Sequence, residues 1–424
     1  MAKQRLSQII LTLLLLPLAA CSLGGGTSSA VPASTPFAPL SAATPTTSIV
    51  GFSFKTSGYS LYAWPPEEDL FPAADFAPNI YRDSTGAVMR KQDGHDYNSP
   101  VTQAQDGLRA LAAYQEAGDK AALRIALADA SRLVEIHTEY AGAWWYPYPF
   151  DFALYGLKSD TTHAPWYSGM AQGEVLDLFT RLWSQTHDAK WRAAAEKTFD
   201  SFLHPYRGKA HVPWVANVAA GYLWLQEYPS PQPDYTINGA FFAVAGIAQY
   251  ALTFSDQRAS LIADGAMTTM LHHTPRVRHP GGISSYSLTH MEDLSAHYHG
   301  VVTKQLALSY TITHDMRFAA LATQFIADFP IPEVSGKMTL PPGTYTFAQR
   351  AAQDGRIKST KQVTLPSALE VTVRLRYKMQ GTAGFWYQIR GGPYEKYWFQ
   401  ESVTNHLTTP LNVVFFSPAV PFTL

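Results

Sequence analysis

Apolar and polar positions alternate between Thr102 and Phe329 in a pattern that recurs four times. In each repeat an apolar run ends in a short polar turn, and an aspartate opens the next apolar run. The four aspartates are Asp119, Asp188, Asp256 and Asp315, at intervals of 69, 68 and 59 residues. An aspartate at this place accepts hydrogen bonds from the free N–H groups of a first helical turn. The pattern therefore predicts four helical hairpins.

Hairpins that each bury one face against the next build a solenoid or close into a ring. We predict a mainly α fold, an α/α toroid (an incomplete barrel) over residues 101–330. The connections between hairpins, Ala141–Ala164, Pro205–Ala220 and Thr274–His297, are too long to be simple turns. We expect them to gather at one end of the toroid and to form a cleft there.

The helical pattern stops near Pro332, and strand-like alternation follows, most clearly over Ala368–Tyr377. Residues 331–424 are predicted to form a small antiparallel β-sandwich. Trp386, Tyr394 and Trp398 are its candidates for glycan binding. Because aromatic residues in strands more often belong to the core, a sandwich that caps the toroid is the favoured interpretation.

The chain begins with a short basic segment, an apolar run over Ile9–Leu16 and then Leu18-Ala19-Ala20-Cys21. This is the pattern of a secretory signal peptide, and its end resembles the lipobox of bacterial lipoproteins, in which the cysteine receives a lipid. We predict a lipoprotein signal with lipidated Cys21 over residues 1–21, and a flexible tether over residues 22–47. Residues 48–100 are expected to wrap the helical domain irregularly. The protein would be exported and anchored to the bacterial membrane, facing the periplasm or at the cell surface.

Composition narrows the classes of partner. The formal net charge of −1 excludes a strongly basic surface for nucleic acid. A single cysteine leaves none for a disulfide once Cys21 is lipidated. Aromatic residues make up 13% of the chain, which fits a carbohydrate-binding protein and a large core equally well. An acidic ligand would have to be bound by a local cluster of residues.

Four stretches are rich in polar and aromatic residues, and by the toroid argument they line one cleft. They are Trp144–Phe150, Pro165–Glu174, the segment from Glu227-Tyr228-Pro229 to Asn238-Gly239, and Ser285–His299. In the third stretch, Pro229, Pro231 and Pro233 disfavour helix and keep the chain extended. We expect this segment to be a rigid loop between two helices, displaying Glu227 and Tyr228.

These stretches resemble the catalytic domain of the D-glucuronyl C5-epimerases, over about Asn98–Phe329. The motifs are Trp166-Tyr167-Ser168-x-Met170-Ala171-Gln172-Gly173, Glu227-Tyr228-Pro229 with Asn238-Gly239, Tyr286-x-Leu288-x-His290, and Tyr298-His299 with Gln305-Leu306. The resemblance implies an isomerase that inverts C5 of glucuronate in heparosan-type polysaccharides without a cofactor or metal. It implies a catalytic set of Glu227, Tyr228, Tyr286 and Tyr298. It implies a substrate-binding set of Trp166, Tyr167, Ser168, Gln172, Asn238, His290 and His299.

The chemistry of that reaction suits these residues. The C5 proton lies α to a carboxylate, so its removal needs a positioned base and neutralisation of the developing aci-carboxylate. Inversion then needs an acid on the opposite face. The resemblance places Glu227 and Tyr228 on one face and Tyr298 on the other, with Tyr286 in binding. The family has an arginine where this chain has Thr289, so Arg276, Arg278, His290 or His297 would have to replace it.

Three other functions stay open from the sequence. A polysaccharide lyase would abstract the same proton and then eliminate the C4 oxygen. A glycan-binding lipoprotein would retain the site without catalysis. An inverting glycosidase needs two carboxylates, and only Glu174 or Asp234 could accompany Glu227. The histidines at 290, 297 and 299 lack zinc-site spacing, so no metal is expected. The oligomeric state, with a homodimer as one alternative, is left open.

Overall fold

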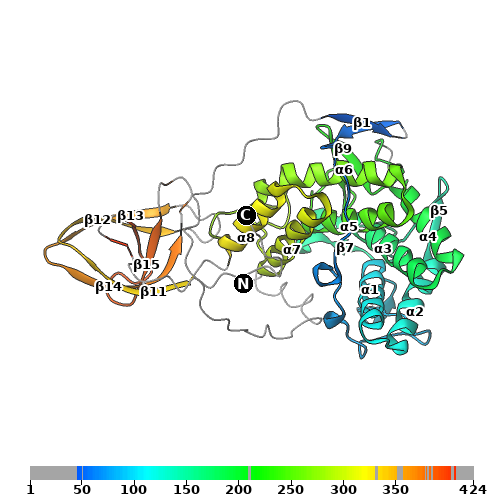
Figure 1. Ribbon diagram of the computed structural model, residues 1–424, viewed down its shortest axis with the longest axis horizontal. Coiled ribbons are helices and arrows are strands. Elements are labelled where there is room, and N and C mark those ends of the chain that lie inside the picture. The colour runs from blue at the N-terminus through cyan, green and yellow to red at the C-terminus, as the bar shows by residue number, and fades with distance from the viewer. Residues whose placement is uncertain are drawn as a thin grey trace. The chain divides into compact units, whose positions relative to one another are not determined.

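The computed structural model describes residues 45–49, 51–208, 212–329, 333–350, 357–377, 379, 382, 385–402 and 405–406 (Figure 1). The predicted signal peptide, Cys21 and most of the tether lie outside these residues. The chain divides into two compact units. The first unit runs up to His272 and includes Thr311–Thr313, and the second comprises His273–Tyr310 and the chain from His314 onward. The division therefore falls within the residues predicted as one helical domain.

Eight helices form the four predicted hairpins. They are α1 (Pro100–Ala117), α2 (Lys120–Ile136), α3 (Gly169–Thr186), α4 (Ala189–Asp200), α5 (Ile237–Phe254), α6 (Gln257–His273), α7 (Ala296–Thr313) and α8 (Met316–Asp328). All four predicted caps are confirmed, because each aspartate accepts a backbone N–H two residues ahead. The distances are 2.8 Å for Asp119, 3.0 Å for Asp188, 2.7 Å for Asp256 and 2.9 Å for Asp315. Each cap contributes roughly 1 kcal/mol.

The hairpins of the first unit stack through their first helices. Helix α3 lies between α1 and α5, while α2 packs on α1 and α4 packs on α3. This is the stacking of an α/α toroid, as predicted. Helix α5 is long and apolar enough to cross a membrane by composition, but 72% of its apolar window is buried inside the protein. We read it as the central helix of the core.

Helices α3 and α5 approach so closely that only glycine fits at their contact. A Cβ atom added at Gly173 would lie 2.4 Å from the Cα atom of Ala243, and one added at Gly246 would lie 2.0 Å from the carbonyl oxygen of Gly173. Real Cβ atoms essentially never make contacts this short. The two backbones therefore pack directly against each other.

Short two-stranded hairpins fill the connections of the first unit. They are β5 (Thr138–Tyr140) with β6 (Ala143–Trp145), β7 (Phe152–Ala153) with β8 (Thr161–Thr162), and β9 (Ala216–Ala219) with β10 (Tyr222–Leu225). Short 3₁₀ helices occur at Leu154–Gly156, Lys158–Asp160, Ser201–Leu203 and, in the second unit, Thr274–Val277. The prediction that Glu227 follows a helix is wrong, because the run before it is the fully buried strand β10.

The N-terminal segment lies along the helices of the first unit. It contains β1 (Thr46–Ile49), β2 (Phe52–Lys55), the 3₁₀ turns Pro66–Glu68 and Ala73–Asp75, β3 (Arg90–Gln92) and β4 (His95–Tyr97). The N–H groups of Ser57 and Gly58 donate to Asp264 on α6 at 2.8 and 2.9 Å. Asp69 forms an ion pair with Arg181 on α3. The segment is thus fastened to two different hairpins.

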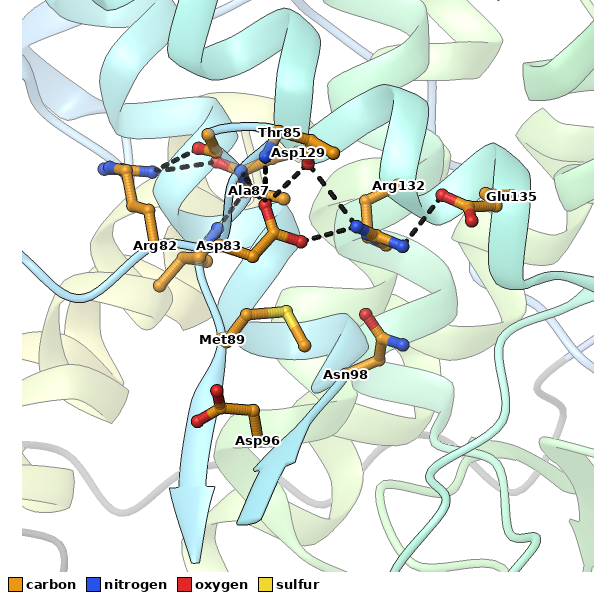
Figure 2. Close-up of polar contacts among 12 residues, drawn as sticks. Arg82, Asp83, Thr85, Ala87, Met89, Asp96, Asn98, Asp129, Arg132 and Glu135 are labelled. Carbon is orange, nitrogen blue, oxygen red and sulfur yellow. Dashed lines mark hydrogen bonds and ion pairs between the residues drawn. The ribbon is translucent and has the colours of Figure 1, made fainter. Parts of the chain in front are cut away.

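A second set of charged contacts ties the same segment to α1 and α2 (Figure 2). Arg82 forms an ion pair with Asp106 on α1 at 2.6 Å, and Asp129 on α2 accepts the Val88 N–H at 2.8 Å. Arg132 on α2 bridges Asp83 and an exposed glutamate. Because Asp106 and Asp129 are buried, these pairs fix the path of the chain into β3.

The second unit ends in six antiparallel strands. They are β11 (Glu333–Leu340), β12 (Gly343–Arg350), β13 (Ile357–Leu365), β14 (Leu369–Tyr377), β15 (Trp386–Arg390) and β16 (Trp398–Gln400), in the order β11-β14-β15-β16-β12-β13. All six strands contribute side chains to one buried core. Figure 1 shows β12 and β13 on one side of this domain and β11 and β14 on the other. The six strands form one antiparallel sheet with a buried core, which confirms a small antiparallel β domain, while the described strands do not separate into the two sheets of a sandwich.

The aromatic residues proposed for glycan binding in this domain belong mainly to its interior. Trp386 and Trp398 are buried in one core cluster, and Tyr394 packs against the other. A glycan platform built on the two tryptophans is therefore wrong, while capping of the toroid stays a prediction.

We predict that Gly246→Ala destabilises the fold by roughly 1–3 kcal/mol, because its Cβ meets backbone that cannot move aside. Gly300→Ala on α7 is the matched control, since an added Cβ meets nothing within 4 Å there. Removing the glycine from a helix should stabilise that variant by roughly 0.5–1 kcal/mol. Chemical unfolding followed by circular dichroism measures both, and equal stability of the two variants would contradict the close contact.

Candidate active site

The segment Gln226–Tyr228 leaves β10 and crosses the first turn of α3. The Gln226 carbonyl accepts the N–H of Gly169 at 2.7 Å, and its own N–H donates to Val215 at 2.7 Å. A Cβ at Gly169 would lie 2.6 Å from the Gln226 carbonyl oxygen, so glycine is required there. The Gln226 side chain donates to Asn217 at 2.8 Å. These contacts hold the segment rigidly, as the sequence predicts.

Glu227 lies against the first turn of α5 and is 8% exposed. A Cβ at Gly239 would lie 2.2 Å from Glu227 Oε2, so the absence of a side chain at Gly239 makes room for the carboxylate. Asn238, another predicted site residue, is buried in the same turn. The N-terminal turn of a helix carries free N–H groups and a partial positive charge, which favour a carboxylate.

Tyr228 belongs to a cluster of aromatic rings. Its ring stacks on Phe152 with centroids 5.6 Å apart and lies 6.1 Å from Trp166. Trp166 in turn stacks on Tyr148 at 3.9 Å, and its indole N–H donates to the Phe150 carbonyl at 2.9 Å. Trp166 is buried among these rings and Tyr228 is half-buried. Trp166 therefore supports Tyr228 from within the core.

Two carboxylates and one arginine set the charge around Tyr228. Glu174 on α3 is 1% exposed, and it accepts from Gln105 at 3.0 Å, while its Oε2 has no hydrogen-bond partner among the residues that the structure describes. Burial raises the pKa of Glu174 well above its ordinary value, the nearby Glu227 raises it further, and Gln105 and Arg109 lower it. Glu174 is accordingly disposed to hold a proton.

Arg90 is the arginine of this cluster. Its guanidinium carbon lies 4.6 Å from the centre of the Phe150 ring. Burial lowers the pKa of Arg90, whereas its interactions with Tyr148 and Tyr228 raise it. Burial raises the pKa of Tyr148. The nearby Glu174 and Glu227 raise it further, and Arg90 lowers it. Tyr148 lies in a stretch that we expect to line the cleft, but no sequence pattern singles out Arg90 or a proton-holding role for Glu174.

Two predicted substrate-binding residues serve the fold instead. Gln172 is fully buried, and its amide accepts from the Tyr146 N–H at 3.0 Å and donates to the Trp144 carbonyl at 2.9 Å and to Ser201 at 2.8 Å. Ser168 is buried and caps α3 by accepting the Ala171 N–H. Both fix the start of α3. Tyr167 is half-buried, and its hydroxyl lies 3.3 Å from that of Thr138.

The second unit brings Tyr286 and Tyr298 together. Their ring centroids are 4.6 Å apart. Tyr286 is held by its N–H, which donates to the Asp293 carbonyl at 2.9 Å, and Tyr298 lies in the first turn of α7, which Ser295 caps. His290 is half-buried, and its N–H donates to Ser287 at 3.0 Å. These contacts fold the connection before α7 into an ordered loop.

His299, also predicted to bind substrate, is buried, and both of its ring nitrogens form hydrogen bonds within the protein. Its Nδ1 accepts from the Ser284 N–H at 3.0 Å, so its Nε2 carries the proton and donates to the Phe325 carbonyl at 2.8 Å. Burial lowers the pKa of His299 and favours this neutral form. The histidine ties the loop to α8 rather than presenting a free ring nitrogen.

Of two candidates to replace the arginine missing at Thr289, one is already paired with an aspartate and the other is exposed. Arg278 forms a two-point ion pair with Asp328, with the closer contact at 2.5 Å. Arg276 is exposed and contacts His273 at 3.1 Å. Within the described ranges, no group of three or more histidine, cysteine or acidic side chains is arranged to hold a metal ion.

The comparisons with known proteins address the same stretch of chain. Residues 138–327 match the family model described as D-glucuronyl C5-epimerase C-terminus. A D-glucuronyl C5-epimerase from Caenorhabditis elegans is 26% identical over 83 residues. That match spans 19% of this chain and only 13% of the length of the relative.

Similar solved structures include several carbohydrate-active enzymes. One is a cellobiose 2-epimerase from Spirochaeta thermophila, with 13% identity and a TM-score of 0.38 over 53% of this chain and 57% of the other. Another is an unsaturated glucuronyl hydrolase from Bacillus sp. GL1, with 15% identity and a TM-score of 0.37 over 54% and 61%. A family 76 α-mannanase from Bacteroides thetaiotaomicron has 10% identity and a TM-score of 0.40 over 66% and 67%. These scores are too low to support an argument about activity.

We predict that Glu174→Gln stabilises the protein at neutral pH. Because the pKa of Glu174 is raised in the folded state, no penalty exists below the unfolded pKa of about 4.3. As the pH rises above that value, the unfolded chain loses the proton first, and stability falls by about 1.4 kcal/mol per unit of pKa difference. The gain in melting temperature should therefore grow from pH 4 to pH 8. Glu116→Gln, at an exposed position on α1, is the control. A gain independent of pH would contradict the buried protonated carboxyl.

Proposed function

We propose that this protein is a uronate C5-epimerase that acts on an acidic polysaccharide, a heparosan-like polymer of glucuronate. The observation that carries the proposal is the Glu227–Tyr228 pair. The Glu227 carboxylate lies against the first turn of α5, and the Tyr228 ring packs on an aromatic cluster. The pair lies within residues that match the C5-epimerase family. A carbohydrate epimerase is the activity that this family and this pair support together.

The reaction exchanges one proton and leaves no net change in composition. A base removes the proton from C5, the electron pair of the C–H bond moves into the aci-carboxylate, and an acid returns a proton to the opposite face of C5. We assign proton transfer on one face of C5 to Glu227 and Tyr228. Glu227 and Tyr228 both remain candidates for the base. No cofactor is required, because no electron leaves the substrate.

The cellular setting is part of the same proposal. A signal peptide ending at a lipidated Cys21 would place the protein outside the cytoplasm, held to a bacterial membrane by its acyl chains. An extracytoplasmic position would give it access to a polymer that is too large to cross the membrane. Incorporation of labelled palmitate, and its loss in Cys21→Ser, would test the anchor.

The activity is tested by incubating the protein with heparosan in D₂O and following C5 by NMR. We expect deuterium to enter C5 while the chain length stays constant. Tyr228→Phe should lower the exchange rate by roughly 10²–10⁴-fold, the range of a lost acid–base group. Tyr140→Phe, at an exposed tyrosine of β5, should leave it unchanged.

Other results would replace the proposal. A rise in ultraviolet absorbance with shortening of the polymer would identify a lyase, the alternative that the absence of an arginine at Thr289 leaves open. Binding of the polymer without exchange at C5 would identify a glycan-binding protein. Inversion at the anomeric carbon with release of sugar would identify a glycosidase.

A smaller substitution tests the seat of Glu227. Gly239→Ala would bring a methyl group to 2.2 Å from Glu227 Oε2 and force the carboxylate to rotate away. Because a side chain rather than backbone is displaced, we expect kcat for exchange to fall at least tenfold with a smaller effect on melting temperature. Retained kcat at an unchanged melting temperature would rule out a catalytic carboxylate at this place.

A further inference from the structure

Arg90 differs from three other half-buried arginines of the first unit. Arg82, Arg132 and Arg181 each form an ion pair with an aspartate. Arg90 makes no side-chain hydrogen bond or ion pair with any residue that the structure describes, and its guanidinium lies over the face of Phe150. A guanidinium carries five N–H donors and stays charged at all physiological pH values. Its hydrogen-bonding capacity is therefore available to a ligand.

The position of Arg90 links it to the proposed catalytic pair. Phe150, on which its guanidinium lies, contacts the Tyr148 ring edge-on at 5.7 Å. Tyr148 stacks on Trp166, and Trp166 contacts the ring of Tyr228. The interaction of Arg90 with the Tyr228 hydroxyl places its positive charge within electrostatic range of that group. Strand β3, which carries Arg90, is fixed by the buried ion pairs of the preceding residues.

An acidic substrate bound in this region would need a cation beside it, and Arg90 can supply that cation. Glu227 and Glu174 are buried beside the aromatic cluster. A substrate that is itself a carboxylate would be repelled by any negative charge on Glu227 unless a cation lay near. A guanidinium binds a carboxylate through two parallel N–H···O bonds, which fix the orientation of the sugar as well as its charge.

We propose that Arg90 binds the carboxylate of the substrate uronate and supplies the cation that Thr289 does not. This inference rests on the proposed function and names the residue that recognises its substrate. As the C5 proton leaves, charge builds on the carboxylate oxygens, and Arg90 stabilises that charge. Arg90 lies outside residues 138–327, so this recognition is added by the N-terminal segment of this chain.

The test compares binding of two polymers to the full-length protein. Heparosan carries the glucuronate carboxylate, and carboxyl-reduced heparosan carries a hydroxymethyl group in its place. Arg90→Met keeps the apolar packing on Phe150 and removes the charge. We expect it to weaken the Kd for heparosan roughly 10- to 100-fold and to leave the Kd for the reduced polymer unchanged. Arg90→Lys, which keeps the charge without the fork, should fall between.

Lys91→Met is the matched control, because the next residue of β3 carries a cation that faces Asp96 and the ring of Tyr81. It should bind both polymers as the wild type does. Melting temperatures identify any variant that fails to fold, and Arg90→Lys then serves in place of Arg90→Met. Equal affinity of the wild type for the two polymers, or equal weakening of both in Arg90→Met, would overturn the proposal.

The C5 exchange experiment separates this inference from the proposed function. If Arg90→Met loses the preference for heparosan but the wild type exchanges no C5 proton, the carboxylate site stands and the epimerase assignment fails. If the wild type exchanges C5 and Arg90→Met keeps the preference, the epimerase assignment stands and the role of Arg90 fails.

Discussion

The direct backbone contact between α3 and α5 is the constraint on which the candidate site depends. Gly173 and Gly246 let the two helices approach to a distance that any larger side chain would prevent. At the start of the same two helices, Gly169 accommodates the Gln226 carbonyl and Gly239 accommodates the Glu227 carboxylate. The segment between β10 and α5 therefore has one path, across two helix N-termini. The four glycines of this close-packed helical pair therefore define where the Glu227 carboxylate and the Tyr228 phenol lie.

Electrostatics give this position its chemical character. Burying a carboxylate is costly unless it is protonated or paired. Glu174 has one hydrogen bond from Gln105 and a raised pKa, which suits a group that holds a proton. Glu227 has the favourable field of the α5 N-terminus instead. Arg90 contributes a positive charge that no described carboxylate neutralises. Such an arrangement is adapted to a ligand that brings its own negative charge, and the proposed uronate substrate does so.

Much of the fold could be predicted from the sequence because its signals are local. The four capping aspartates repeat at near-constant spacing, and each accepts the N–H that the pattern predicts. The alternation of apolar and polar residues over Ala368–Tyr377 is also a local signal, and it predicts β14. The strand Tyr222–Leu225 could not be told from a helix, because a short apolar run fits either when it is fully buried. The internal roles of Gln172 and His299 depend on partners far along the chain. The surroundings of Arg90 do too, because its neighbour Phe150 comes from the connection between α2 and α3. Motif likeness identified Glu227 and Tyr228, but it could not show which polar residues the fold itself uses.

The most direct measurement is a crystal structure of Tyr228→Phe with a heparosan oligosaccharide bound. We predict a glucuronate whose C5 atom lies within about 3.5 Å of the Glu227 carboxylate or of the site of the lost hydroxyl. A sugar bound only on the C-terminal sheet, or one that presents its anomeric carbon rather than C5 to Glu227, would contradict this prediction.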